Sequence, residues 1–258
     1  MRDTASPIPS GAVMVMSCDA YRDLWTPFFT LFWRFWPDCP FPVYLGSNRA
    51  SFNHSRVRTL AGGDSSWSKV LRLSLERIDA AYILLLLDDF FLDRPVDHET
   101  IGRHLQTLDA LHGTVLRLFP HPPPQTTLLP AHPDLGRLSP AAEYRVSAQA
   151  AWWNRTELLA LLRDEESIWD FEWNGTARVR NIPDGFYSTY KKALSYRQVI
   201  ERGQWFWGAA RYYARQQIGC DFTARSVMGP GKALKKAINR FRKNSISSVM
   251  CIRVAGVI

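Results

Sequence analysis

The stretch Tyr82-Ile-Leu-Leu-Leu-Leu-Asp-Asp-Phe-Phe-Leu92 decides the fold of this 258-residue chain. Its first six residues form a continuous apolar run of strand length, which is typical of a parallel strand buried on both faces of a sheet. The run ends abruptly in Asp88 and Asp89. Adjacent carboxylates at a strand end are costly unless they meet a cation, a sugar hydroxyl or water. We favour a functional acid pair here; the alternative is that the pair only ends the strand and caps the next turn.

Strand and helix signals alternate on both sides of this central strand. Short strands are predicted at 12–16, 42–45, 57–60 and 114–119. Amphipathic helices are predicted from about residue 23, over 64–78 with Asp64 or Ser65 as the N-cap, and from Asp97 to Gly113. This alternation predicts an α/β fold with a mostly parallel central sheet that helices cover on both faces.

The pattern is less regular after residue 119. Residues 121–139 are rich in proline and turn residues, which predicts a surface loop or flap. Residues 144–151 are expected to return as a strand, followed by a short helix at 156–162. No clear period is visible from there to about residue 204.

The net charge of +8 is unevenly distributed. Residues 205–258 hold ten Lys or Arg side chains and one acid, whereas the rest of the chain is nearly neutral. We therefore expect one domain at 1–205 and a basic helical extension at 206–258. Within the extension, 232–243 has the pattern of a basic amphipathic helix, which lies on anionic membrane surfaces. The alternative is a helix packed on the domain with its charges in water; nucleic acid is not expected as a partner, because no recognised binding module accompanies the charge.

Composition and missing signals narrow the class of protein. The N-terminus lacks the apolar core of a signal peptide, and no apolar run approaches the 18–20 residues of a membrane span. Four scattered cysteines favour a reducing compartment. We expect a cytoplasmic protein that the basic helix places on the inner face of the plasma membrane. No Gly-rich phosphate loop is present, which argues against kinases and dehydrogenases.

Polar residues follow three of the predicted strands. Ligands of open α/β sheets bind outside the carboxyl ends of the strands, so we expect these residues to share a nucleotide site. Carboxylates beside a diphosphate suit Mg²⁺ or Mn²⁺. The candidates for this site are Ser17, Asp19, Asp64, Asp88 and Asp89.

A second group of candidates lies between residues 149 and 172. A carboxylate within reach of a hydroxyl can act as a general base, and Glu172 and then Asp170 are the candidates; an ordinary solvated acidic loop is the alternative. Sugar contacts are predicted for Gln149, Trp152, Trp153 and Trp169, with core packing as the alternative for Trp152 and an internal hydrogen bond for Gln149. Arg117, a charge in an apolar strand, either neutralises a phosphate or, as we prefer, pairs with an acid.

These segments together resemble the donor half of GT-A glycosyltransferases, whose fold is Rossmann-like. More narrowly, the chain is similar to a group found in capsule and lipopolysaccharide O-antigen gene clusters. The shared motifs are an apolar strand that ends in an acidic pair and Phe, then Leu116-Arg-Leu118, Ser147-Ala-Gln-Ala-Ala-Trp152 and Glu166-Ser-Ile-Trp-Asp-Phe-Glu172. The resemblance covers roughly residues 11–205.

The resemblance implies transfer of a sugar from a nucleotide-sugar, with a UDP-sugar preferred, to a glycan or lipid-linked oligosaccharide acceptor. The usual metal motif of these enzymes is Asp-x-Asp, whereas Phe90 stands two residues after Asp88. Asp89 is therefore expected to take the metal or diphosphate and Asp88 the ribose or donor sugar, and metal dependence stays open.

Two other classes of protein remain as alternatives. A non-catalytic GT-A-like scaffold that binds a glycan or partner enzymes at the membrane would not need the acids at the end of the 82–87 strand. A nucleotidyltransferase would normally carry a Gly-rich, basic loop after its first strand, where this chain has Ser17-Cys-Asp-Ala-Tyr21.

Overall fold

The computed structural model describes residues 8–121, 123–129, 132–229 and 231. The predicted membrane-binding helix at 232–243 lies outside the described residues. The chain divides into two compact units, Met1–Arg197 and Gln198–Ile258, and each is described by itself.

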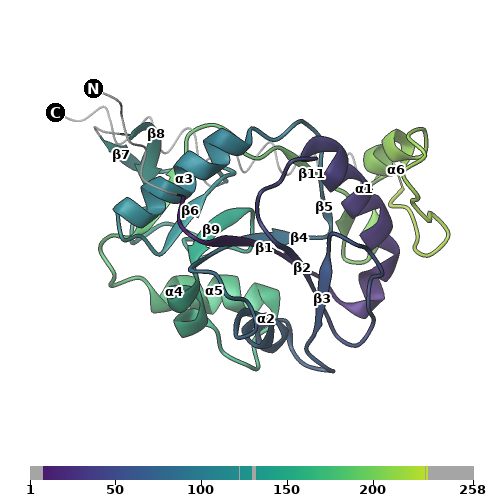
Figure 1. Ribbon diagram of the computed structural model, residues 1–258, viewed down its shortest axis with the longest axis horizontal. Helices are drawn as coiled ribbons and strands as arrows, with labels where there is room; N and C mark the ends of the chain where they lie inside the picture. The colour runs from purple at the N-terminus through teal and green to yellow at the C-terminus, as the bar shows by residue number, and fades with distance from the viewer. Residues whose placement is uncertain (1–7, 122, 130–131, 230, 232–258) are drawn as a thin grey trace. The chain divides into compact units, whose positions relative to one another are not determined.

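A nine-stranded sheet forms the centre of the first unit, with the strand order β3-β2-β1-β4-β9-β6-β10-β8-β7 (Figure 1). Strands β3, β2, β1 and β4 run parallel to one another, and β9 lies antiparallel between β4 and β6. The predicted α/β fold is confirmed, and the sheet is parallel in its first half and mixed in its second. The strands are β1 (Gly11–Met16), β2 (Val43–Ser47), β3 (Arg58–Ala61), β4 (Tyr82–Leu87), β6 (Val115–Arg117), β7 (Thr126–Leu129), β8 (His132–Arg137), β9 (Ala151–Asn154) and β10 (Phe186–Thr189).

Helices cover both faces of this sheet, as predicted. Helices α1 and α3 lie over one face, and α2, α4 and α5 over the other (Figure 1). Asp97 caps α3 as expected, whereas the N-cap of α2 is Ser66, which accepts a hydrogen bond from the Lys69 N–H at 3.1 Å, and not Asp64 or Ser65. The helical elements are the 3₁₀-helix η1 (Asp19–Leu24), α1 (Trp25–Phe35), α2 (Trp67–Leu75), α3 (His98–Ala110), α4 (Arg155–Leu161) and α5 (Ile168–Arg178).

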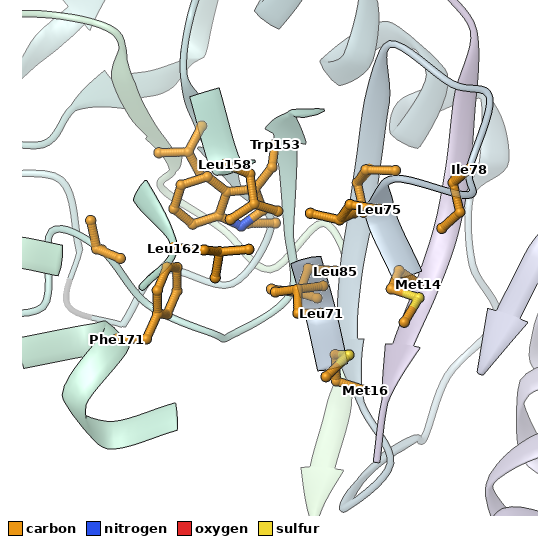
Figure 2. Close-up of a cluster of buried hydrophobic side chains, with 14 of the residues drawn as sticks. Met14, Met16, Leu71, Leu75, Ile78, Leu85, Trp153, Leu158, Leu162 and Phe171 are labelled. Carbon is orange, nitrogen blue, oxygen red and sulfur yellow. The ribbon is translucent and has the colours of Figure 1, made fainter. Parts of the chain in front are cut away.

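The core on the α2–α4–α5 side packs large side chains of the sheet against those of the helices. Alternate residues of β1, β4 and β9 point into it and meet Leu71 and Leu75 of α2 and Phe171 of α5 (Figure 2). Successive strand residues face opposite sides, so Trp153 enters this core while Trp152 enters the other. Trp152 packs edge-on against Phe41 with ring centroids 5.0 Å apart.

Two predictions from the irregular part of the sequence are wrong. Residues 121–139 do not form a loop throughout, because β7 and β8 pair as an antiparallel hairpin and β8 extends the sheet beyond β10. Residues 144–150 are not a strand; they form bends and turns, and β9 begins only at Ala151. Buried small residues in this segment imitate the apolar run of a strand.

The second unit is small. Strands β12 (Ile200–Glu201) and β13 (Gln204–Trp205) pair antiparallel, and α6 (Trp207–Tyr213) follows. Its core includes the fully buried ring of Trp205, whose backbone bonds to Ser226 and Met228. In neither unit does a described helix have the length and apolar character needed to cross a membrane.

Candidate functional site

Asp88 and Ser17 meet where β4 and β1 end. The parallel register pairs Met16 with Leu87, so the next residues of both strands lie side by side. The Ser17 hydroxyl donates to Asp88 Oδ2 and accepts from Trp25 Nε1 at 2.7 Å. Asp88 is buried, so this bond fixes one of its oxygens at the carboxyl edge of the sheet.

Asp19 and Asp64 lie farther along the same edge, toward β2 and β3. The Asp19 carboxylate accepts the backbone N–H groups of Asn48, Arg49 and Ala50, with N–O distances of 3.1 Å. Arg49 in turn forms an ion pair with Asp64, in which both side chains are exposed. The structure thus brings the predicted residues to one edge, but it uses both acids to hold the loop that follows β2.

Asp89 is held differently from its neighbour. Burial raises the pKa of the Asp89 carboxyl from 3.8 to about 7, against a smaller opposing effect from its own backbone N–H. Within the part of the chain that the structure describes, no Lys, Arg or His forms an ion pair with it. Among the described residues its charged form therefore has no cationic partner, and a bound cation would supply one.

Glu172 reaches the same end of the sheet from α5. Its Oε1 accepts hydrogen bonds from the Ser147 hydroxyl and the Ala148 N–H, both at 2.8 Å. A Cβ on Gly175 would lie 2.9 Å from Val146 Cγ1, so the glycine lets α5 pack closely on this segment. The close packing places Glu172 beside the residues that lead into β9.

Arg117, the last residue of β6, is buried next to these groups. Its Nη1 donates to the His121 carbonyl at 3.3 Å, while Nε and Nη2 have no hydrogen-bond partner among the described residues. Burial lowers the pKa of Arg117 to about 10, and the negative charge of Glu172 opposes that fall. The preferred expectation, an ion pair with an acid, is not met within the described residues.

Tyr196 completes what we call the edge cluster, namely Asp89, Arg117, Gln149, Glu172 and Tyr196. Its hydroxyl donates to Gln149 Oε1 at 2.9 Å, so Gln149 makes the internal hydrogen bond that was the alternative to a sugar contact. Burial raises the pKa of Tyr196, and the charges of Asp89 and Glu172 raise it further. No pattern in the sequence marked Tyr196, which lies in the irregular stretch and reaches the cluster only through tertiary packing.

Asp170 has a structural role rather than the expected catalytic one. It is exposed and forms a capping box with Ser167 at the start of α5: its carboxylate accepts from the Ser167 N–H at 3.1 Å, and Ser167 Oγ accepts from the Asp170 N–H at 3.2 Å. These bonds lower the pKa of Asp170, which makes it a weaker base. Glu166 is likewise occupied, because Arg178 binds it at 2.7 Å.

The predicted sugar-stacking residues separate into two groups. Trp152 and Trp153 are fully buried, so they belong to the core and offer no face to an acceptor. Trp152 Nε1 donates to the Ile101 carbonyl at 3.2 Å, which satisfies its polar atom. Trp169 is 72% exposed on α5 and keeps its predicted role as a candidate.

A divalent metal at this edge would need ligands from a substrate as well as from the protein. Among the described residues, no three His, Cys, Asp or Glu side chains come together in a group that could hold an ion. Mg²⁺ is commonly bound through one or two carboxylates together with substrate phosphates. Asp89, the residue expected to take the metal, is the carboxylate that would hold such an ion, and a bound diphosphate would have to supply further ligands.

Comparison with known proteins bears on the fold. No protein-family model and no curated protein matches the chain. Among solved structures it is similar to Staphylococcus aureus TarS 1–349 in complex with UDP-GlcNAc, with a TM-score of 0.50 and 12% identity over 76% of this chain and 60% of that one. The same protein in complex with UDP matches with a TM-score of 0.49 and 11% identity, over 72% and 59% of the two chains. A mycobacterial protein matches with a TM-score of 0.46 and 12% identity, over 86% and 77%.

The similarity to TarS 1–349 in complex with UDP-GlcNAc shows a GT-A-like α/β fold, as predicted. The chain spans about 60% of the TarS 1–349 structure it matches. What the fold does in this protein is therefore argued from its own residues.

Proposed function

We propose that the protein is a glycosyltransferase that moves a sugar from a nucleotide-sugar, preferably a UDP-sugar, to a glycan or lipid-linked glycan during surface polysaccharide synthesis. The observation that carries the proposal is the arrangement of carboxylates at one edge of the sheet. Asp88 and Asp89 end β4, and Glu172 lies across the start of β9. The solved TarS complexes with UDP and UDP-GlcNAc, which share the fold, support this reading.

The donor side of the site is assigned to the ends of β1 and β4. Ser17 orients Asp88 toward the ribose or donor sugar, and Asp89 faces the diphosphate. A divalent cation bound there would neutralise the charge of the leaving diphosphate. The same cation would provide the partner that the Asp89 carboxylate lacks.

The acceptor side is assigned to Glu172. Its Oε1 is fixed by Ser147 and Ala148, which leaves Oε2 to take the proton of an acceptor hydroxyl. The acceptor oxygen then bonds to the anomeric carbon of the donor, and the bond from that carbon to the diphosphate breaks. The nucleoside diphosphate leaves, and the transfer inverts the anomeric configuration.

Nucleotide binding tests the proposal directly. We would screen UDP, GDP, CDP and dTDP by thermal shift, with and without Mn²⁺, and then supply the matching nucleotide-sugars. Asp89→Asn should lose the nucleotide-dependent shift, whereas Glu172→Gln should keep it and lose transfer. Glu157→Gln is the matched control, since it changes an exposed carboxylate on α4, outside the edge cluster, and should retain both. Absence of any nucleotide-dependent shift in the wild-type protein would overturn the proposal.

We also propose a peripheral membrane location through the basic extension. The support is the charge of residues 205–258, since the helix at 232–243 lies outside the described residues. A lipid-linked acceptor would then be presented at the surface to which the extension binds.

A further inference from the structure

Helix α5 exposes two tryptophans, Trp169 and Trp173. The sequence predicted a sugar contact for Trp169 and no role for Trp173. Trp169 and Trp173 lie one turn apart, and each is 72% exposed. The other exposed large hydrophobic side chains in the described residues lie between 38% and 52%. Single exposed hydrophobic side chains are common on protein surfaces, so it is the pairing of two such rings on one helix turn that makes this surface a candidate binding site.

The exposure is not a failure of the helix to bury its apolar side. Phe171 is fully buried and packs against Trp67, with ring centroids 5.3 Å apart, and Gly175 packs on Val146. The inner face of α5 is therefore complete, and the two tryptophans belong to its outer face. Neither ring contacts another aromatic ring or a cation among the described residues, so both are open to a ligand.

The surroundings of the two rings favour a sugar over a lipid or protein surface. Glu165 is exposed just before the helix, and Asp170 and Asn174 are exposed on it, where they also bond to Ser167 and Glu166. A membrane or protein contact would call for a larger contiguous apolar patch than two rings surrounded by polar residues. Flat rings interspersed with carboxylate and amide groups instead match a sugar, which has an apolar C–H face and a rim of hydroxyls.

Glu172 connects this surface to the edge cluster. At 100° per residue, Trp169, Glu172 and Trp173 occupy an arc of roughly 100° on α5. The two tryptophans are separated by about 6 Å along the helix axis. Glu172 lies at one end of this arc, and its carboxylate bonds to Ser147 and Ala148 at the sheet edge. The aromatic pair therefore lies next to the side chain that is assigned as the base.

We propose that Trp169 and Trp173 form an acceptor platform, on which each ring stacks against one of two successive sugars of a glycan chain. The acceptor is therefore an oligosaccharide or polysaccharide, and a single sugar is too short to use the whole platform. The assignment of this glycan as acceptor rests on the proposed function, whereas its binding to the two rings does not.

Glycan binding without any donor tests the platform. Oligosaccharides of one to six units from the chito, malto and cello series would be titrated against the wild-type protein, with tryptophan fluorescence and calorimetry as readouts. Affinity for at least one series should rise sharply from one unit to two. Trp169→Ala and Trp173→Ala should each weaken binding, and the double variant should weaken it at least tenfold.

The matched control is Trp207→Ala, which removes a tryptophan of α6 that is 38% exposed and carries the Arg211 guanidinium over its ring. This variant should bind glycans normally. The Trp169 and Trp173 variants should keep the wild-type melting temperature, because these two rings lie outside the core.

The outcomes separate the platform from the proposed function. Glycan binding that is lost in the double variant, in a protein that binds no nucleotide, supports the platform and refutes the glycosyltransferase. Binding of nucleotide with no binding of any oligosaccharide, or glycan binding that the double variant retains, overturns the platform. Loss of binding to phosphatidylglycerol vesicles in the double variant, with no effect of glycans, would also overturn it in favour of a lipid contact.

Discussion

Replacing Asp89 by Asn should make the protein more stable at neutral and alkaline pH. Burial raises the pKa of this carboxyl from 3.8 to about 7, so the folded state holds its proton up to a pH at which the unfolded chain has lost it. Stability attributable to this group therefore falls as pH rises from about 4 to about 7, and the full cost is present above that range. A difference of about three pKa units corresponds to about 4 kcal/mol, which is the upper limit of the gain in the Asn variant.

The assay is urea unfolding of both proteins between pH 4.5 and 8. Their unfolding free energies should be close at the acid end and diverge steadily toward pH 8. Asp79→Asn provides the control, since Asp79 is an exposed carboxylate between α2 and β4 and its removal should leave the pH profile unchanged. Parallel profiles for the Asp89→Asn variant and the wild type would refute the reasoning, because they would mean that Asp89 ionises as easily in the folded protein as in water.

Four further predictions concern the base, the buried arginine, the tail and the core. Glu172→Gln should reduce the rate of transfer by roughly 10²–10⁴-fold in a product assay, the range for loss of a general base; near wild-type turnover would remove Glu172 from the mechanism. Arg117→Met should leave the unfolding free energy in urea equal or raise it by about 1–3 kcal/mol, since an unpaired buried cation gives way to an apolar side chain; a large loss would reveal a partner essential to folding. Removing 232–258 should abolish salt-sensitive co-sedimentation with anionic vesicles while sparing a water-soluble acceptor, because each Lys or Arg near the surface contributes about 1 kcal/mol; retained binding would place the contact elsewhere. Trp152→Ala should lose about 3–5 kcal/mol in urea unfolding, whereas Trp169→Ala should stay within about 0.5 kcal/mol, and similar losses would contradict their different burial.

The parallel half of the sheet could be predicted because each of its strands carries its own signal. A half-buried strand alternates apolar and polar residues, whereas the run before Asp88 is apolar throughout. This run forms β4, which lies inside the sheet between β1 and β9. Once parallel strands are assigned, their carboxyl ends must share an edge, so Ser17 and Asp88 could be placed together without a structure.

The second half was harder because its strands depend on neighbours rather than on local pattern. β8, with the sequence His-Pro-Asp-Leu-Gly-Arg, has little of the apolar character of a strand, and it forms by adding to the edge of β10. Residues 144–150 show the opposite case, in which the sequence predicts a strand that does not form. Their small apolar side chains are buried without strand pairing.

The candidate site was predictable in its location and less so in its chemistry. Nothing in the sequence shows that Asp19 would be occupied by the loop at 48–50, or that Asp170 would cap a helix while Glu172, two residues later, would turn toward the sheet. These differences arise from which side of a helix or loop faces the core. That choice depends on packing between segments that are far apart in the chain.

The antiparallel insertion of β9 between β4 and β6 has a consequence for how the chain emerges from the ribosome. Strands β3, β2, β1 and β4 are complete within the first 87 residues and can pair as soon as they are synthesised. The far side of β4 then has no strand partner until Asn154 has been made, because β6 reaches β4 only through β9. During that interval the nascent protein presents the most apolar strand of its sheet as an open edge, the kind of edge that recruits other chains. The interval in which the protein is most prone to aggregate is therefore set by the position of one four-residue strand, Ala151–Asn154.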